Sequence, residues 1–120
     1  MYSKKVMEHF LKPHNMGKLK NADSIGIAGN VICGDVMKIY IKVTKKDETF
    51  FIKDISFQTL GCAAAIASSS VVTELAKGKT IKEALSLGRE EVTKALGVLP
   101  PHKVHCILLA LDALSEAIYD

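Results

Sequence analysis

The segment VMKIYIKV, residues 36–43, alternates apolar side chains with lysines and predicts the centre of the fold. Alternation with a period of two is typical of a β-strand that buries one face. The polar turn KKDE follows at residues 45–48, and a second apolar run occupies residues 49–59. The apolar phase of this run shifts near residues 53–54, which predicts a bulge or turn there. These segments predict an antiparallel meander of two or three strands.

The N-terminal segment predicts a short amphipathic helix. Ser3 can cap this helix, which runs to about Lys12, and Pro13 ends it. Its apolar residues are spaced to form one stripe: Val6, Met7, Phe10 and Leu11. Residues 14–32 show little periodicity, so we expect an irregular segment with at most one short strand.

The second half of the chain predicts helices. Residues 63–77 are rich in alanine, lack glycine and proline, and stop at Gly78, a common left-handed helix terminator. Thr80 and Glu83 have the spacing of a capping box and predict a second, short helix. Residues 90–96 predict a third helix.

A final helix is expected from about Val104, after a break at residues 99–101, and its apolar residues recur on one face. Residues 1–120 therefore predict a single α+β domain. We expect a small antiparallel sheet of about three strands, with an N-terminal helix and a run of C-terminal helices packed on one face. The other face of the sheet would stay available for partners.

The composition is that of an ordinary folded protein, with 48% hydrophobic and 24% charged residues. The formal net charge is +3, and lysines crowd the first twenty residues. No aromatic and basic motif accompanies this charge, so we expect steering of an acidic protein partner and no nucleic-acid binding. The N-terminus resembles neither a signal peptide nor a membrane span, which predicts a cytoplasmic location and no membrane association.

Three cysteines, Cys33, Cys62 and Cys106, are the candidate functional residues. An odd cysteine count without a secretory signal argues against a disulfide framework and for reduced thiols. Cys62 and Cys106 fall at predicted helix N-termini, where the helix dipole stabilises the thiolate that binds metal or attacks sulfur. Asp35 and His105 offer an oxygen and a nitrogen donor beside them in sequence.

Spacing alone leaves three interpretations of these cysteines open, because they lie far apart and form no CxxC pair. They fit a shared metal or cluster site, independent thiols, or a cysteine nucleophile with a histidine base. The last is disfavoured for His105 and Cys106, because the side chains of adjacent helical residues diverge by about 100°.

Three segments occur in order along the chain: CGDVMK at residues 33–38, GCAAAIASSS at 61–70 and LPPHKVHC at 99–106. They resemble segments of the IscU family, also known as the NifU N-terminal domain. The resemblance begins at YSKKV, residues 2–6, and spans nearly the whole chain. It implies an α+β fold with the three cysteines converging at one exposed end. It also implies a scaffold, not an enzyme, on which iron–sulfur clusters are assembled and then passed to recipient apoproteins.

The resemblance assigns roles to the candidate residues. Cys33, Cys62 and Cys106 would bind iron in a [2Fe–2S] cluster, with Asp35 or His105 as the fourth ligand. An aspartate is a hard ligand that is poorly matched to such a cluster, so it would favour release. Cys106 would also accept persulfide sulfur from a cysteine desulfurase.

The resemblance also implies partners beyond the desulfurase and the recipients. An LPPxK stretch, which an Hsp70-type chaperone grips in many members, is matched here by Leu99, Pro100, Pro101 and Lys103. Lys103 resembles a residue that can occupy the site when metal is absent. Iron or electron donors are further expected partners, and the protein would be a monomer or a homodimer.

One alternative stays open, a zinc-binding sulfur acceptor that stimulates a cysteine desulfurase, as in the SufU group. That group carries an insertion before its third cysteine and lacks a histidine beside it, whereas this chain has His105 and no evident insertion. The other three histidines, His9, His14 and His102, are expected to be surface residues, because no donor partner recurs around them. The serines at residues 68–70 are expected to pack within a helix against the sheet.

Overall fold

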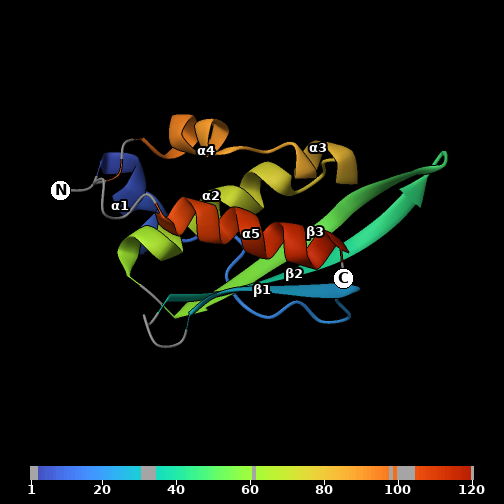
Figure 1. Ribbon diagram of the computed structural model, residues 1–120, viewed down its shortest axis with the longest axis horizontal. Coiled ribbons are helices and arrows are strands. Elements are labelled where there is room, and N and C mark those ends of the chain that lie inside the picture. The colour runs from blue at the N-terminus through green and yellow to red at the C-terminus, as the bar shows by residue number, and fades with distance from the viewer. Residues whose placement is uncertain (1–2, 31–34, 61, 98, 100–104, 120) are drawn as a thin grey trace.

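The computed structural model describes residues 3–30, 35–60, 62–97, 99 and 105–119. The elements along these residues are α1 (Lys4–Leu11), β1 (Ser24–Asn30), β2 (Asp35–Lys46), β3 (Thr49–Leu60), α2 (Ala63–Ala76), α3 (Ile81–Leu85), α4 (Arg89–Leu96) and α5 (His105–Tyr119). This order confirms the predicted α+β class, a three-strand antiparallel sheet with one helix before it and several after it (Figure 1). Within the described ranges, no helix has the length and apolar character needed to cross a membrane.

The sheet has the strand order β1-β2-β3, and neighbouring strands are antiparallel. β2 and β3 form a long hairpin, whose turn residues Asp47 and Glu48 have φ values of 51° and 66°. Two left-handed residues at a tight turn suit the right-handed twist of the flanking strands. The bulge predicted near residues 53–54 is confirmed, because the pairing of β2 with β3 shifts between Lys42 and Val43.

Helices cover one face of the sheet (Figure 1). α2 and α5 pack against each other and against the strands, and α3 and α4 lie on their far side from the sheet. The sheet contributes large side chains to the core: Met37, Ile39, Ile41, Ile55 and Phe57. The two helices contribute mainly small ones, including Ala64, Ala67, Ser68, Ala110 and Ala113. Residues 68–70 are all buried in α2, as expected. Ser69 faces the sheet, where it contacts Met37, whereas Ser70 faces α1 and bonds to His9.

β1 and α5 approach each other very closely at Gly26. A Cβ atom at this position would overlap the backbone of Ala113 and Ala117. Ser24, on the same strand, donates its hydroxyl to the carbonyl of Ala117. The missing side chain of Gly26 therefore lets α5 lie directly on β1.

The outer edge of β3 is covered at two points. Phe57 exchanges backbone hydrogen bonds with the segment after α1, accepting from Gly17 at 2.8 Å and donating to Asn15 at 2.9 Å. Ile52 does the same with the turn after α2, at 2.8 Å to both Gly78 and Lys79. The polar groups of these edge residues are thus satisfied within the chain.

The segment between α1 and β1 passes the helix-free face of the sheet (Figure 1). It runs from Asn15, beside β3, to Asp23, whose N–H donates to the carbonyl of Ile41 on β2 at 2.8 Å. Tyr40 points to this face and yet is only 5% exposed. The face is therefore only partly available, and its exposed apolar residues include Ile25 and Ile27 on β1 and Leu60 at the end of β3.

α1 begins as predicted, because the Ser3 hydroxyl accepts a hydrogen bond from the N–H of Val6 at 3.2 Å. The apolar stripe along α1 is narrower than predicted. Val6 is fully buried, whereas Met7 is 38% and Leu11 69% exposed. An eight-residue helix at the margin of the molecule offers only one turn of contact to the core, so the ends of the stripe reach solvent.

Candidate functional site

Cys62 occupies the N-cap position of α2. Its φ and ψ of −81° and −179° are extended, and its carbonyl accepts a helical hydrogen bond from the N–H of Ile66 at 3.1 Å. The side chain is half-buried and packs against the core. This end of a helix favours negative charge, because the first backbone N–H groups point toward it. The prediction that Cys62 stands at a helix N-terminus is confirmed.

Cys106 is the second residue of α5, so it lies in the first turn of this helix. Its side chain is fully buried. His105, the first residue of α5, is exposed, and its Nε2 lies 3.8 Å from Sγ of Cys106. The expectation that these two side chains pair poorly is wrong. The imidazole is long enough to reach across the angle between the two Cβ directions.

Figure 1 shows that α2 and α5 begin at the same end of the molecule, where β2 also begins and β3 ends. The two helices pack against each other. Cys62 and Cys106 therefore lie in the first turns of neighbouring helices at one end of the fold.

The other predicted site residues lie outside the described part of the chain: Cys33, the side chain of Asp35, Pro100, Pro101 and Lys103. Their roles stay predictions. Leu99 is described, and it is 4% exposed within the core. Its expected role in chaperone binding also stays a prediction, with the added requirement that Leu99 must first leave the core.

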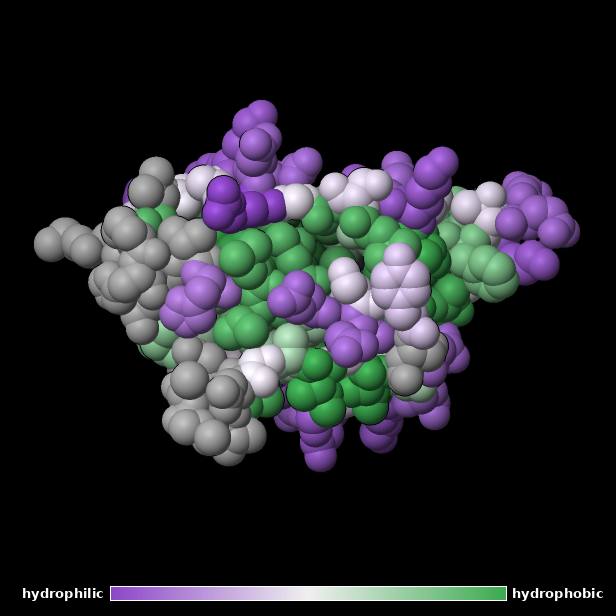
Figure 2. Space-filling model, viewed as in Figure 1, coloured by the Kyte–Doolittle hydropathy of each residue, from purple (hydrophilic) through white to green (hydrophobic). Residues whose placement is uncertain are grey.

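A shallow hollow lies on the sheet at the end where α2 and α5 begin. It has a volume of about 370 Å³ and is lined by Val36, Lys38, Gln58, Thr59 and Leu60. Leu60 is 74% exposed and ends β3. On the face drawn in Figure 2, apolar side chains gather over α5 and over β1, bordered by hydrophilic ones. Exposed Leu60 and the hollow lie at the same end of the fold as Cys62 and Cys106, and exposed apolar surface beside a candidate site is typical of a protein that docks partners there.

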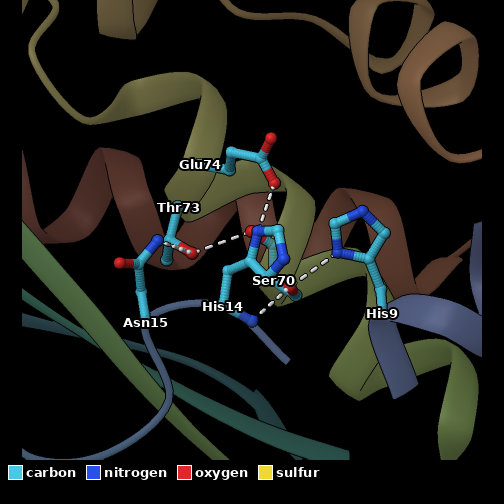
Figure 3. A network of polar contacts seen from close by, with 6 residues as sticks. All are labelled: His9, His14, Asn15, Ser70, Thr73 and Glu74. Carbon is cyan, nitrogen blue, oxygen red and sulfur yellow. Dashed lines mark hydrogen bonds and ion pairs between the residues drawn. The ribbon is translucent and has the colours of Figure 1, made fainter. Parts of the chain in front are cut away.

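A second group of polar side chains, missed by the sequence analysis, joins α1 to α2 (Figure 3). His14 Nδ1 lies 2.6 Å from Oε2 of Glu74, and His9 Nδ1 lies 2.8 Å from Oγ of Ser70. The backbone N–H of His14 donates to the same Ser70 oxygen at 2.8 Å. The prediction that His14 lies at the surface is confirmed, and His9 is half-buried. The prediction that neither histidine has a donor partner is wrong, while His102 lies outside the described residues.

This network changes the proton affinity of His9. Burial lowers the pKa of His9 below its ordinary value, and the neighbouring charge of His14 lowers it further. The carboxylates of Glu74 and Glu8 act in the opposite direction. The neutral imidazole of His9 is thus favoured in the folded protein.

The sequence model of the NifU-like N-terminal domain matches residues 1–120. The chain belongs to the NifU-like N-terminal domain family. This confirms the resemblance that was carried by the three cysteine segments.

Relatives of this NifU-like domain share its whole length. The iron–sulfur cluster assembly scaffold protein IscU 1 of Archaeoglobus fulgidus is 59% identical over 120 residues, which are 100% of this chain and 76% of that protein. An IscU scaffold protein of Aquifex aeolicus is 46% identical over 119 residues, 99% of this chain and 74% of that one. A mitochondrial iron sulfur cluster assembly protein 1 of Debaryomyces hansenii is 47% identical over 123 residues and is covered to 67%.

Solved structures of similar proteins have the same fold. A hypothetical protein aligns with a TM-score of 0.76 and 32% identity, covering 97% of this chain and 95% of its own. The SufU protein of Fervidobacterium islandicum AW-1 aligns with a TM-score of 0.71 and 26% identity, covering 98% and 96%. This chain therefore shares its overall fold with these two proteins.

Proposed function

We propose that this chain is an iron–sulfur cluster assembly scaffold, which holds the cluster as cargo and catalyses no reaction of its own. The observation that carries the proposal is the 59% identity across the whole chain to a scaffold protein of Archaeoglobus fulgidus. The placement of Cys62 and Cys106 in the first turns of neighbouring helices supports it, because thiolates are the ligands that iron–sulfur clusters prefer.

The cargo that we propose is a [2Fe–2S] cluster with Cys33, Cys62 and Cys106 as its thiolate ligands. Asp35 or His105 supplies the fourth donor. Three thiolates and one weaker oxygen or nitrogen donor would hold a cluster less firmly than four thiolates. Such a site suits temporary assembly, followed by transfer to a recipient apoprotein.

Sulfur reaches the site as a persulfide on a cysteine desulfurase. The Cys106 thiolate attacks the terminal persulfide sulfur, a new S–S bond forms on Cys106, and the desulfurase cysteine leaves as a thiolate. Because Cys106 is fully buried in the structure, this attack requires that docking of the desulfurase uncovers it. The hollow beside Leu60 lies at the same end of the molecule and is the surface on which we place that docking.

The function is tested by measuring iron, zinc and acid-labile sulfide per chain, with a visible spectrum, before and after anaerobic reconstitution. The reconstitution contains ferrous iron, cysteine and a cysteine desulfurase. We expect equal iron and sulfide with sulfide-to-iron charge-transfer bands. Serine at Cys33, Cys62 or Cys106 is expected to abolish stable cluster, whereas Glu90→Gln on α4 serves as a surface control.

Two results would count against this function. Full cluster retention in any one of the three cysteine variants would contradict shared ligation. Zinc that iron and sulfide cannot displace, in a protein that still stimulates the desulfurase, would instead favour a zinc-dependent sulfur acceptor.

A further inference from the structure

Three metal-binding side chains from different elements meet in a cluster that includes none of the cysteines. His9 lies on α1, His14 follows α1, and Glu74 lies on α2, with one potential ligand atom of each within 4.8 Å of the others. Glu74 is twelve residues after Cys62, which corresponds to about 18 Å along a helix that rises 1.5 Å per residue. This cluster is therefore separate from the proposed iron–sulfur site.

We propose that His9, His14 and Glu74 form a second metal site, for a divalent transition-metal ion such as zinc. Two imidazoles and one carboxylate are a donor set that zinc accepts, with a fourth position left for water or a further ligand. The site does not depend on the proposed scaffold function, because it uses none of the cysteine ligands.

The present spacing of the donors is close to the spacing that a bound metal ion would require. His14 Nδ1 and Glu74 Oε2 are 2.6 Å apart, the separation of two groups that share a proton. Two ligands on a tetrahedral zinc ion with bonds of about 2.0–2.1 Å lie about 3.3 Å apart. The pair would therefore separate by less than about 1 Å, and His9 would move inward, when an ion enters.

Ser70 holds two of the three ligands in place. It is fully buried on α2, and its Oγ contacts both the backbone N–H of His14 and Nδ1 of His9 at 2.8 Å. When His9 donates from Nδ1 to Ser70, its Nε2 is the nitrogen that can bind metal. Histidines that ligate metals commonly bond their second nitrogen to such a partner. Asn15 adds a bond to Thr73 at 3.3 Å, which ties the His14 loop to α2.

The cluster is accessible to an ion from solvent. The side chains of His14 and Glu74 are 53% and 52% exposed. A cavity of about 450 Å³ adjoins the two histidines, and Glu8, Leu11 and Lys12 complete its lining. Glu8 adds a carboxylate within this cavity, whereas Lys12 adds an opposing positive charge. A bound ion would connect α1 to α2 and so stabilise the fold by linkage.

The site is tested by zinc and cobalt titration of a variant in which Cys33, Cys62 and Cys106 are all serine. We expect one metal ion per chain, a raised melting temperature, and a cobalt spectrum without sulfur-to-metal charge transfer. His14→Gln and Glu74→Gln are each expected to weaken zinc binding at least tenfold. The matched control Glu90→Gln removes one exposed helix carboxylate elsewhere and is expected to bind zinc unchanged. Absence of binding at about a tenfold excess of zinc would overturn the proposal.

If the triple variant does not fold, a second test uses the chain with its three cysteines unchanged. Zinc titration of the wild-type chain is then compared with that of His14→Gln, which is expected to lose one class of bound zinc. Equal zinc content and affinity in the two proteins would overturn the proposal. Iron and sulfide loading of His14→Gln is measured in parallel, and its retention separates this site from the scaffold function.

Discussion

His105 Nε2 lies 3.8 Å from Sγ of Cys106 in the first turn of α5. A nitrogen and a sulfur ligand on one tetrahedral metal ion, with bonds of about 2.1 and 2.3 Å, lie about 3.6 Å apart. The two side chains therefore stand close to the spacing of ligands on one ion. This relationship makes His105 a concrete candidate for the fourth donor beside Asp35.

Replacing His105 with alanine is expected to lower the amount of cluster held after reconstitution, because a donor close to ligand spacing is lost. The measurement is iron and sulfide per chain together with the visible spectrum. An unchanged spectrum and stoichiometry in His105→Ala would remove His105 from the ligand set.

Replacing Asp35 with alanine is expected to lengthen the lifetime of the cluster and to slow its transfer to a recipient apoprotein. The reason is that a hard carboxylate loosens the cluster, so its loss leaves a tighter site. The decay of the visible bands and the rate of recipient activation measure the two effects. A transfer rate equal to that of the wild type would contradict this role.

Replacing Gly26 with alanine is expected to destabilise the fold by about 3 kcal/mol or more, at the upper end of overpacking effects. The added Cβ overlaps backbone atoms of Ala113 and Ala117, which cannot rotate away as a side chain can. Urea unfolding measures the change in the free energy of unfolding. Ile25→Ala, at an exposed position of the same strand, is the control and is expected to cost less than about 1 kcal/mol.

Replacing Ser68 with alanine is expected to raise the free energy of unfolding by about 1 kcal/mol, because a buried polar group without a hydrogen bond is costly. Ser68 Oγ is buried and has no hydrogen-bond partner among the described residues. Ser69→Ala is the comparison, because the Ser69 hydroxyl contacts Met37 Sδ at 3.4 Å. A lower melting temperature in Ser68→Ala would show that this hydroxyl is satisfied in solution.

Lowering the pH from 8 to 5, with a chelator present, is expected to remove stability through His9. Burial and the charges of His14 and Lys5 lower its pKa in the folded state, against the opposing effect of Glu74 and Glu8. Below the ordinary value of 6.5 the unfolded chain then binds more protons than the folded one, so stability falls as the pH falls through this window. The loss is complete below the folded-state pKa.

The pH effect is measured by urea unfolding of the wild type and of His9→Asn, whose amide can still contact Ser70. The difference between the two pH profiles isolates His9 from the other titrating groups. Parallel profiles would show that His9 does not contribute to the pH dependence.

The strands and helix ends could be predicted from the sequence because their signals are local. Alternation in residues 36–43 marked β2, and the phase shift near residues 53–54 marked the bulge. The capping box of Thr80 and Glu83 appears as predicted, with both reciprocal hydrogen bonds present. Short-range backbone chemistry determines each of these features.

The contacts between distant segments could not be predicted in the same way. Glu74 follows His14 by sixty residues, and the local sequence pattern around either residue does not predict their contact. The close approach at Gly26 likewise depends on how α5 crosses β1. For the candidate site, the helix starts at Cys62 and Cys106 were predictable, whereas the burial of Cys106 depends on the packing of whole elements.

The hydrogen bonds that Phe57 and Ile52 make along the outer edge of β3 have a consequence for the behaviour of the protein at high concentration. A scaffold must keep apolar surface such as Leu60 exposed beside reactive thiols, and exposed strand edges invite self-association into extended sheets. Because both of these edge residues are already bonded within the chain, a second copy cannot pair with β3 at Phe57 or Ile52. The chain can therefore expose Leu60 to its partners while two positions along the same strand are closed to pairing with another copy.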